Sequence, residues 1–251
     1  MVELVYQLYK DHHYIFEEIN MTRYIHNLLL NHKDLIDQGE FEQLYNNTLA
    51  TFKCELTQVL LACGIDPFID AKKIFNNAFN YSNEEVTYEI VPGITEIEQC
   101  AFEGTTMNKV NIPSTVTQIG ARAFYGCSVQ EVNFESGSQE LVIGVNAFEN
   151  CTRLKNIVIP NRCKIISPFA FREALLKSCK LSENLIELGD YAFFGTDVAE
   201  IEIPKTIKHI GKAPFHNCYY LKKLRCPEFI RGTKNQENLM FGITENIIEW
   251  Y

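Results

Sequence analysis

The dipeptide Ala-Phe recurs along the chain at nearly constant spacing, and this period limits the fold more than any other feature. Its phenylalanines follow one another after 22, 24, 23 and 22 residues, and a sixth copy, Ala213-Pro214-Phe215, follows after another 22. The six phenylalanines are Phe102, Phe124, Phe148, Phe171, Phe193 and Phe215. Periods of about 20–50 residues are typical of solenoids, in which each repeat is one unit stacked on its neighbours.

Each repeat also predicts a short β-strand. Within residues 109–112 apolar and polar residues alternate, and Pro113 then ends the strand because it lacks a backbone donor. Equivalent strands are expected at residues 88–90, 132–134, 157–159, 179–181, 201–203 and 224–226. One such unit is too small to bury its own apolar face. We therefore expect the strands to pair in parallel along the stack, with the recurring phenylalanine inside.

The nine cysteines are explained by the same repeats. Cys127, Cys151 and Cys218 share the position three residues after the phenylalanine, and Cys163 and Cys226 fall on other inward positions. The chain has no C-x-x-C pair, so the spacing supports neither a zinc site nor a thioredoxin-like motif. These five cysteines are predicted to be buried, reduced and apolar in character.

The unit V-N-I-P-S-T-V-T-Q-I-G-A-R-A-F-Y-G-C, from Val110 to Cys127, resembles the BspA-like leucine-rich repeats. The resemblance covers about residues 86–227, with departures at Pro214 and Ser167 and in the turn after Phe171. It implies a curved solenoid with one open sheet face, and many relatives are cell-surface binding proteins. The expected fold class is an α/β-type leucine-rich-repeat solenoid with short parallel strands, mostly irregular or short-helical connections, and an N-terminal all-α region.

Three segments follow from this pattern. Apolar residues at helical spacing predict a helical N-terminal region or cap over residues 1–64. Residues 65–227 form the predicted solenoid of about six repeats plus a degenerate first one. The stretch 65–80 is either that degenerate repeat, because Ile74 and Phe79 have the repeat spacing, or a plain helix. Residues 228–251 are the predicted C-terminal cap, in which Trp250 either seals the edge or contacts a partner.

Charge and composition exclude several classes of function. The net charge is −9, and residues 1–85 hold 13 Asp and Glu against 6 Lys and Arg, so the acidity lies in the N-terminal third. No long basic block supports nucleic-acid binding, and no apolar run reaches the roughly 18 residues of a membrane span. Because we recognise no secretory signal either, we expect a cytoplasmic protein.

Catalytic motifs are missing from the sequence. We find no phosphate-binding glycine loop, no H-E-x-x-H and no G-x-S-x-G, so we expect no enzyme activity, no catalytic residues, no cofactor and no metal. What remains is the open face of the sheet, because solenoids often bind partners through such faces. We therefore predict a non-catalytic module that binds a protein partner.

The residues predicted to contact that partner lie beside the inward apolar residues of each strand and point outward. They are Asn111, Glu131, Asn133, Lys180, Glu200, Glu202, Lys223 and Arg225, with the charge densest in the last four. Two other hypotheses stay open. The chain is an adhesin-like protein of a surface or particle, or the acidic helical region is the working part and the solenoid its scaffold.

Overall fold

A computed structural model of the chain describes residues 73–74, 88–90 and 93–251. All of them belong to one compact unit, Ala71–Tyr251. The helices predicted within residues 1–64, and most of the stretch 65–80, lie outside the described residues.

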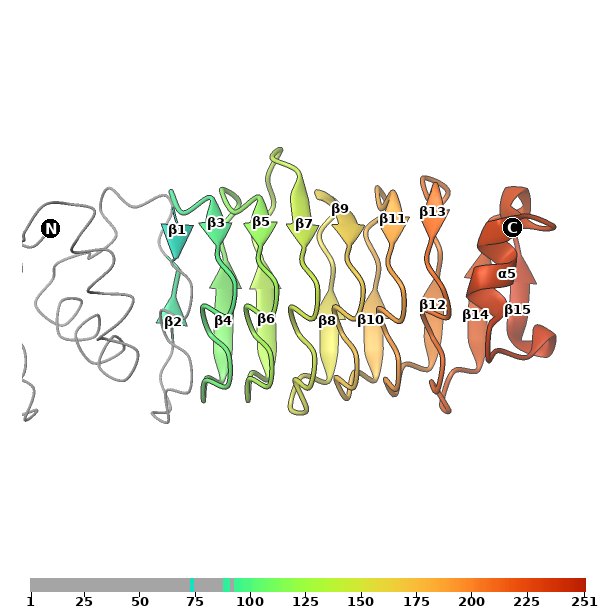
Figure 1. The fold of residues 1–251 in the computed structure, drawn as a ribbon. Coiled ribbons are helices and arrows are strands. Elements are labelled where there is room, and N and C mark those ends of the chain that lie inside the picture. Colours follow the sequence, from blue (N-terminus) through green and yellow to red (C-terminus); the bar gives the residue numbers. More distant parts are fainter. Residues whose placement is uncertain (1–72, 75–87, 91–92) are drawn as a thin grey trace, which may run out of the picture. The chain divides into compact units, whose positions relative to one another are not determined.

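Each turn of the solenoid contributes two short strands, so the stack carries two parallel sheets (Figure 1). We call the first the long sheet, since its seven strands pair without interruption. Its strands are β1 (Lys73–Ile74), β3 (Glu96–Ile97), β5 (Gln118–Ile119), β7 (Leu141–Ile143), β9 (Cys163–Ile166), β11 (Glu187–Leu188) and β13 (His209–Ile210). Ile74 in β1 lies opposite Ile97 in β3, which is the register that a first repeat in this stretch requires.

The second row of strands corresponds, within one residue at each end, to the strands predicted from the sequence and adds one that was not predicted, β15; we call this row the split sheet. Its strands are β2 (Tyr88–Glu89), β4 (Lys109–Ile112), β6 (Glu131–Phe134), β8 (Asn156–Val158), β10 (Ser178–Lys180), β12 (Glu200–Glu202), β14 (Lys223–Cys226) and β15 (Ile248–Trp250). Pairing is broken between β6 and β8 and again between β10 and β12. The expectation of one sheet face was therefore incomplete, because the long sheet adds a second outward face.

The six repeated phenylalanines form a continuous stack through the core. None is more than 1% exposed, and neighbouring ring centroids lie 5.0 to 5.5 Å apart. This separation is close to the roughly 4.8 Å between paired strands, so each ring rests on the ring of the next turn. The prediction that these side chains point inward is confirmed.

Four of the five cysteines assigned to the repeats are buried, and Cys218 is half-buried. They are more than apolar filler, because several thiols reach a backbone carbonyl of the preceding turn. Cys127 Sγ donates to the Phe102 carbonyl at 2.7 Å, and Cys151 Sγ donates to the Phe124 carbonyl at 3.1 Å. The cysteine column thus links successive turns by weak hydrogen bonds.

Each turn bends at two residues in the left-handed region, one on each side of the phenylalanine. Two residues before it, non-glycine residues have φ between 53° and 59°; they are Cys100, Arg122, Asn146, Phe169, Tyr191 and Ala213. The conformation is held because these amides bond to the next turn, as Arg122 N does to the Val145 carbonyl at 2.9 Å. The sequence shows little sign of this bend, since only some turns place glycine after the phenylalanine.

The segment after β14 contains η1 (Glu228–Ile230), α5 (Lys234–Met240) and η2 (Glu245–Ile247). The helix α5 covers the edge of β13 through two asparagines. Asn235 Oδ1 accepts from Ile210 N at 3.0 Å, and Asn238 Nδ2 donates to the Ile210 carbonyl at 2.7 Å. These side chains replace the strand that would otherwise pair with the last member of the long sheet.

Candidate functional site

All eight residues predicted to bind a partner lie on the outward face of the split sheet. Parallel pairing places Asn111 opposite Asn133 at one end, and Glu200 opposite Lys223 and Glu202 opposite Arg225 at the other. Six of the eight are exposed, and Lys223 and Arg225 are half-buried. Within each group of paired strands, the residues of a predicted outward column are therefore neighbours in space.

The part of this face on β4 and β6 satisfies its own polar groups. Lys109 Nζ lies 2.9 Å from Glu131 Oε1, and Asn133 Nδ2 donates to the same carboxylate at 2.6 Å and to Asn111 Oδ1 at 3.2 Å. The hydrogen bond from Lys109, followed by that from Asn133, lowers the pKa of Glu131. Ion pairs as exposed as Lys109–Glu131 contribute little to the stability of the fold. What these contacts determine is the arrangement of charges on this part of the face.

The first break in the split sheet, between β6 and β8, forms a hollow of about 580 Å³. It follows the insertion Ser136-Gly137-Ser138, which lengthens this turn by two residues. Beneath it, the buried Arg162 donates to the Pro113 carbonyl at 3.0 Å and to the Glu135 carbonyl at 3.3 Å. Of the predicted residues, Glu131, Asn133 and Lys180 line this hollow, and Asn111 does not.

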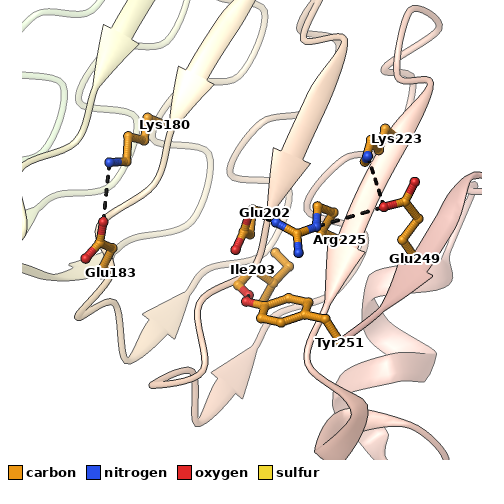
Figure 2. Close-up of polar contacts among 8 residues, drawn as sticks. All are labelled: Lys180, Glu183, Glu202, Ile203, Lys223, Arg225, Glu249 and Tyr251. Carbon is orange, nitrogen blue, oxygen red and sulfur yellow. Dashed lines mark hydrogen bonds and ion pairs between the residues drawn. The ribbon is translucent and has the colours of Figure 1, made fainter.

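The second break, between β10 and β12, forms a hollow of about 600 Å³ that we call the charged groove. Five of the predicted residues meet here. Its polar lining consists of Lys180, Glu183, Glu200, Glu202, Lys205, Lys223, Arg225 and Tyr251. Figure 2 shows six of these side chains, those of Lys180, Glu183, Glu202, Lys223, Arg225 and Tyr251. The predicted charge cluster is thus a single concave surface.

Arg225 is the centre of the ion pairs along the groove (Figure 2). It bonds to Glu202 on β12, and its Nε lies 3.9 Å from Glu249 on β15. Glu249 in turn lies 3.0 Å from Lys223 Nζ. The sign of the charge therefore alternates across three strands, from Glu202 to Arg225 to Glu249. The two carboxylates together orient the Arg225 guanidinium.

Tyr251 closes one side of the groove. Its hydroxyl donates to the Ile203 carbonyl at 2.6 Å, and its ring lies 4.8 Å from the Arg225 guanidinium carbon and 5.2 Å from Lys205 Nζ. Burial, reinforced by the charge of Glu202, raises the pKa of this phenol. Both cations lie within the range of a cation–π contact with this ring.

The sequence did not reveal three residues that line the groove, Glu183, Lys205 and Tyr251, or the ion-pair partner Glu249. Lys205 follows a strand rather than lying within one, and β15 falls after the last repeat, where the spacing gives no register. The alternating Ile248-Glu249-Trp250 is the only local signal of a further strand. Among the described residues, Glu200 has no ion-pair partner, although it lies opposite Lys223.

Among the described residues, no group of three His, Cys, Asp or Glu residues could hold a metal ion. The described cysteines are free, and burial raises the pKa of Cys127 to about 12, which keeps that thiol protonated and unreactive at neutral pH. Within the same residues, no helix combines the length and the apolar character needed to cross a membrane.

Comparison with known families gives a match over most of the chain. The model for the BspA type leucine rich repeat region matches residues 72–142 and 141–247, in six copies. The chain therefore belongs to the BspA-type leucine-rich repeat family. Members of this family are generally protein-binding or surface-associated, and they are typically non-enzymatic scaffolds.

Comparison with solved structures finds similar leucine-rich repeat proteins at low sequence identity. A leucine-rich cell surface protein from Faecalibacterium prausnitzii is 23% identical, with a TM-score of 0.43, and the match covers 61% of this chain and 49% of that one. A leucine-rich repeat protein from Bacteroides ovatus is 20% identical, with a TM-score of 0.44, over 71% and 45% of the two chains. A leucine-rich repeat protein from T. pallidum is 24% identical, with a TM-score of 0.41, over 55% and 78%.

This chain spans about half the length of the first two of these proteins that it matches. Among curated proteins, none matches it significantly.

Proposed function

We propose that this protein binds another protein through the outward face of the split sheet, with the charged groove as the main contact. The observation that carries the proposal is the break between β10 and β12, which turns a flat face into a hollow of about 600 Å³. A concave surface with fixed charges offers both shape and electrostatic complementarity to a partner.

The charges of the groove indicate what kind of surface it fits. Acidic and basic side chains are interspersed along it, so a uniformly charged polymer such as nucleic acid is a poor match. The carboxylate of Glu200 is exposed and has no ion pair among the described residues, so it is available to a basic side chain. We therefore favour a protein partner that presents at least one Lys or Arg beside acidic residues.

Two other hypotheses about the function can be tested alongside this one. The chain could act outside the cell as an adhesin-like protein, or the predicted helical region 1–64, which lies outside the described residues, could carry the activity. A cytoplasmic location also stays a prediction. Cell fractionation combined with an alkylation assay for oxidised cysteines separates the first reading from ours, because a cytoplasmic module keeps all its thiols reduced.

The direct test is affinity capture with the wild-type chain and two charge-swapped variants. The first combines Glu200→Lys, Glu202→Lys, Lys223→Glu and Arg225→Glu, which preserves net charge while inverting the groove. The matched control, Lys234→Glu with Glu237→Lys, inverts an exposed ion pair on α5, outside the split sheet. Our proposal expects one stoichiometric partner that is lost with the first variant and retained with the second.

All three proteins must show the same thermal midpoint for this comparison to count. A partner retained by the groove variant would contradict the proposal and direct attention to residues 1–64 or to the long sheet.

A further inference from the structure

The two sheets end differently at the C-terminal side of the solenoid. The edge of the long sheet is covered, because Asn235 and Asn238 of α5 bond to the backbone of Ile210 in β13. The split sheet instead gains one more strand, β15, which pairs only with β14 among the described strands. One sheet is thus closed by a helix, and the other ends in an additional edge strand.

The outer edge of β15 exposes backbone groups of known identity. Tyr251 N donates to the Cys226 carbonyl at 2.9 Å, and Glu228 N donates to the Tyr251 carbonyl at 2.9 Å. In a parallel strand, successive residues direct their backbone groups to opposite sides. The odd-numbered residues therefore face β14, whereas the backbone groups of Ile248 and Trp250 face away from it, where no described strand pairs with them. The Ile248 N–H donates to the Glu245 carbonyl at the end of η2, so the groups that a further strand can use are the Trp250 N–H and the carbonyls of Ile248 and Trp250.

Incomplete burial of the side chains at this end agrees with an open edge. The inward residues Leu224 and Cys226 on β14 are 0% exposed, because strands cover them on both sides. Their neighbours on β15, Ile248 and Trp250, are only half-buried. An edge strand with free backbone groups and partly exposed apolar side chains is a template for a further strand.

Charge decides what kind of strand fits. Along the outward column the sign alternates from Glu202 to Arg225 to Glu249, so the next position favours a basic residue. A second copy of β15 does not satisfy this requirement. The antiparallel register that pairs all three of its residues with their counterparts places the two Glu249 side chains opposite each other, which is unfavourable.

We infer that β15 is a docking edge for an extended segment of another protein, which adds to the split sheet as its next strand. The segment carries a Lys or Arg that faces outward beside Glu249, flanked by apolar residues that cover Ile248 and Trp250. This inference concerns the edge of the sheet and does not depend on the proposed binding in the charged groove.

The first test measures amide exchange by NMR in the intact chain alone. We expect the Trp250 amide to exchange fast and the Glu249 amide, which faces β14, to be protected. Protection of Trp250 in the free protein would overturn the inference, because another part of the chain or a second copy would then already cover the edge.

The second test uses a synthetic peptide as the probe, Ser-Val-Thr-Ile-Lys-Val-Thr-Ser, and its matched form with Glu in place of Lys. We expect the Lys peptide to slow exchange at Trp250 and to bind about two- to five-fold tighter than the Glu peptide, as cross-strand charge pairs allow. Glu249→Lys should reverse that preference. Equal binding of both peptides, or no binding at millimolar concentration, would overturn the inference.

A pair of variants shows whether the backbone is used. Trp250→Pro removes the outward donor at a position where the bond to β14 is not affected, and Trp250→Ala removes the same side chain but keeps the donor. Peptide binding should fall further in the proline variant than in the alanine variant. Equal loss in both would mean that only the Trp250 side chain makes contact, which contradicts strand addition.

Discussion

The Phe148 ring stacks on the Phe171 ring with their centroids 5.3 Å apart and their planes inclined by only 2°. Each ring is fully buried, and each also contacts the next ring on its other side. The stack therefore joins turns that are 23 residues apart in the sequence, and it is where the solenoid is most sensitive to loss of volume.

Phe148→Ala should lower the stability of the whole solenoid by about 3–5 kcal/mol, because it removes a buried ring from the middle of the stack and leaves a cavity. Chemical denaturation monitored by circular dichroism measures the change. Glu202→Lys is the control, since it alters an exposed position and should cost less than about 1 kcal/mol. An equal loss in both variants would mean that the inward and outward assignments are wrong.

Two glycines should respond very differently to alanine. A Cβ on Gly120 would lie 2.6 Å from the backbone carbon of Glu98 in the preceding turn, so Gly120→Ala should force the turns apart. A Cβ on Gly126 would meet nothing within 4 Å, and only its φ of 66° is unfavourable, at about 1–2 kcal/mol. Thermal unfolding of both variants should rank Gly120→Ala as clearly the more damaging one.

Loss of the Asn235 side chain should destabilise the end of the long sheet. Asn235→Ala leaves the Ile210 amide and the Lys208 carbonyl without their partners, which costs about 1–3 kcal/mol. Glu237→Ala on the same helix breaks only an exposed pair with Lys234 and should be nearly neutral. Hydrogen exchange at Ile210 reports the local effect. Unchanged protection there in Asn235→Ala would contradict the proposed edge contact.

Stability should fall in alkaline solution because of the buried thiols. Burial raises the pKa of Cys127 and Cys163 to about 12, against an ordinary value of 9.0. Between these two pH values the unfolded chain releases thiol protons that the folded chain retains, so rising pH favours unfolding. The stabilisation of the folded state by these two protonated thiols is fully present below pH 9 and is lost as the pH approaches 12.

This dependence can be checked by denaturant titrations at intervals from pH 7 to pH 11. In Cys127→Ala, the free energy of unfolding should fall less steeply with pH, because one of the titrating thiols is gone. A decline of unchanged slope would show that tyrosines and lysines, rather than this cysteine, dominate the alkaline transition.

The sequence by itself determined the repeat, its length, the strands of the split sheet and the inward side of each strand. Those properties are local, because a strand of alternating polarity ended by proline can be recognised in one repeat and then checked against the others. The columns Asn111–Asn133 and Glu202–Arg225 followed directly, since equal spacing places equivalent residues side by side once the strands pair in parallel.

Tertiary structure alone decided the long sheet, the two breaks and the last strand. The strands of the long sheet are as short as two residues, such as Gln118–Ile119, and they exist only because neighbouring turns supply their hydrogen bonds. The break at β10 and β12 and the pairing of Glu249 with Lys223 and Arg225 depend on how turns settle against one another. Repeats encode the stacking unit, whereas irregularities in the stack arise from packing between units, and the candidate site is built from those irregularities.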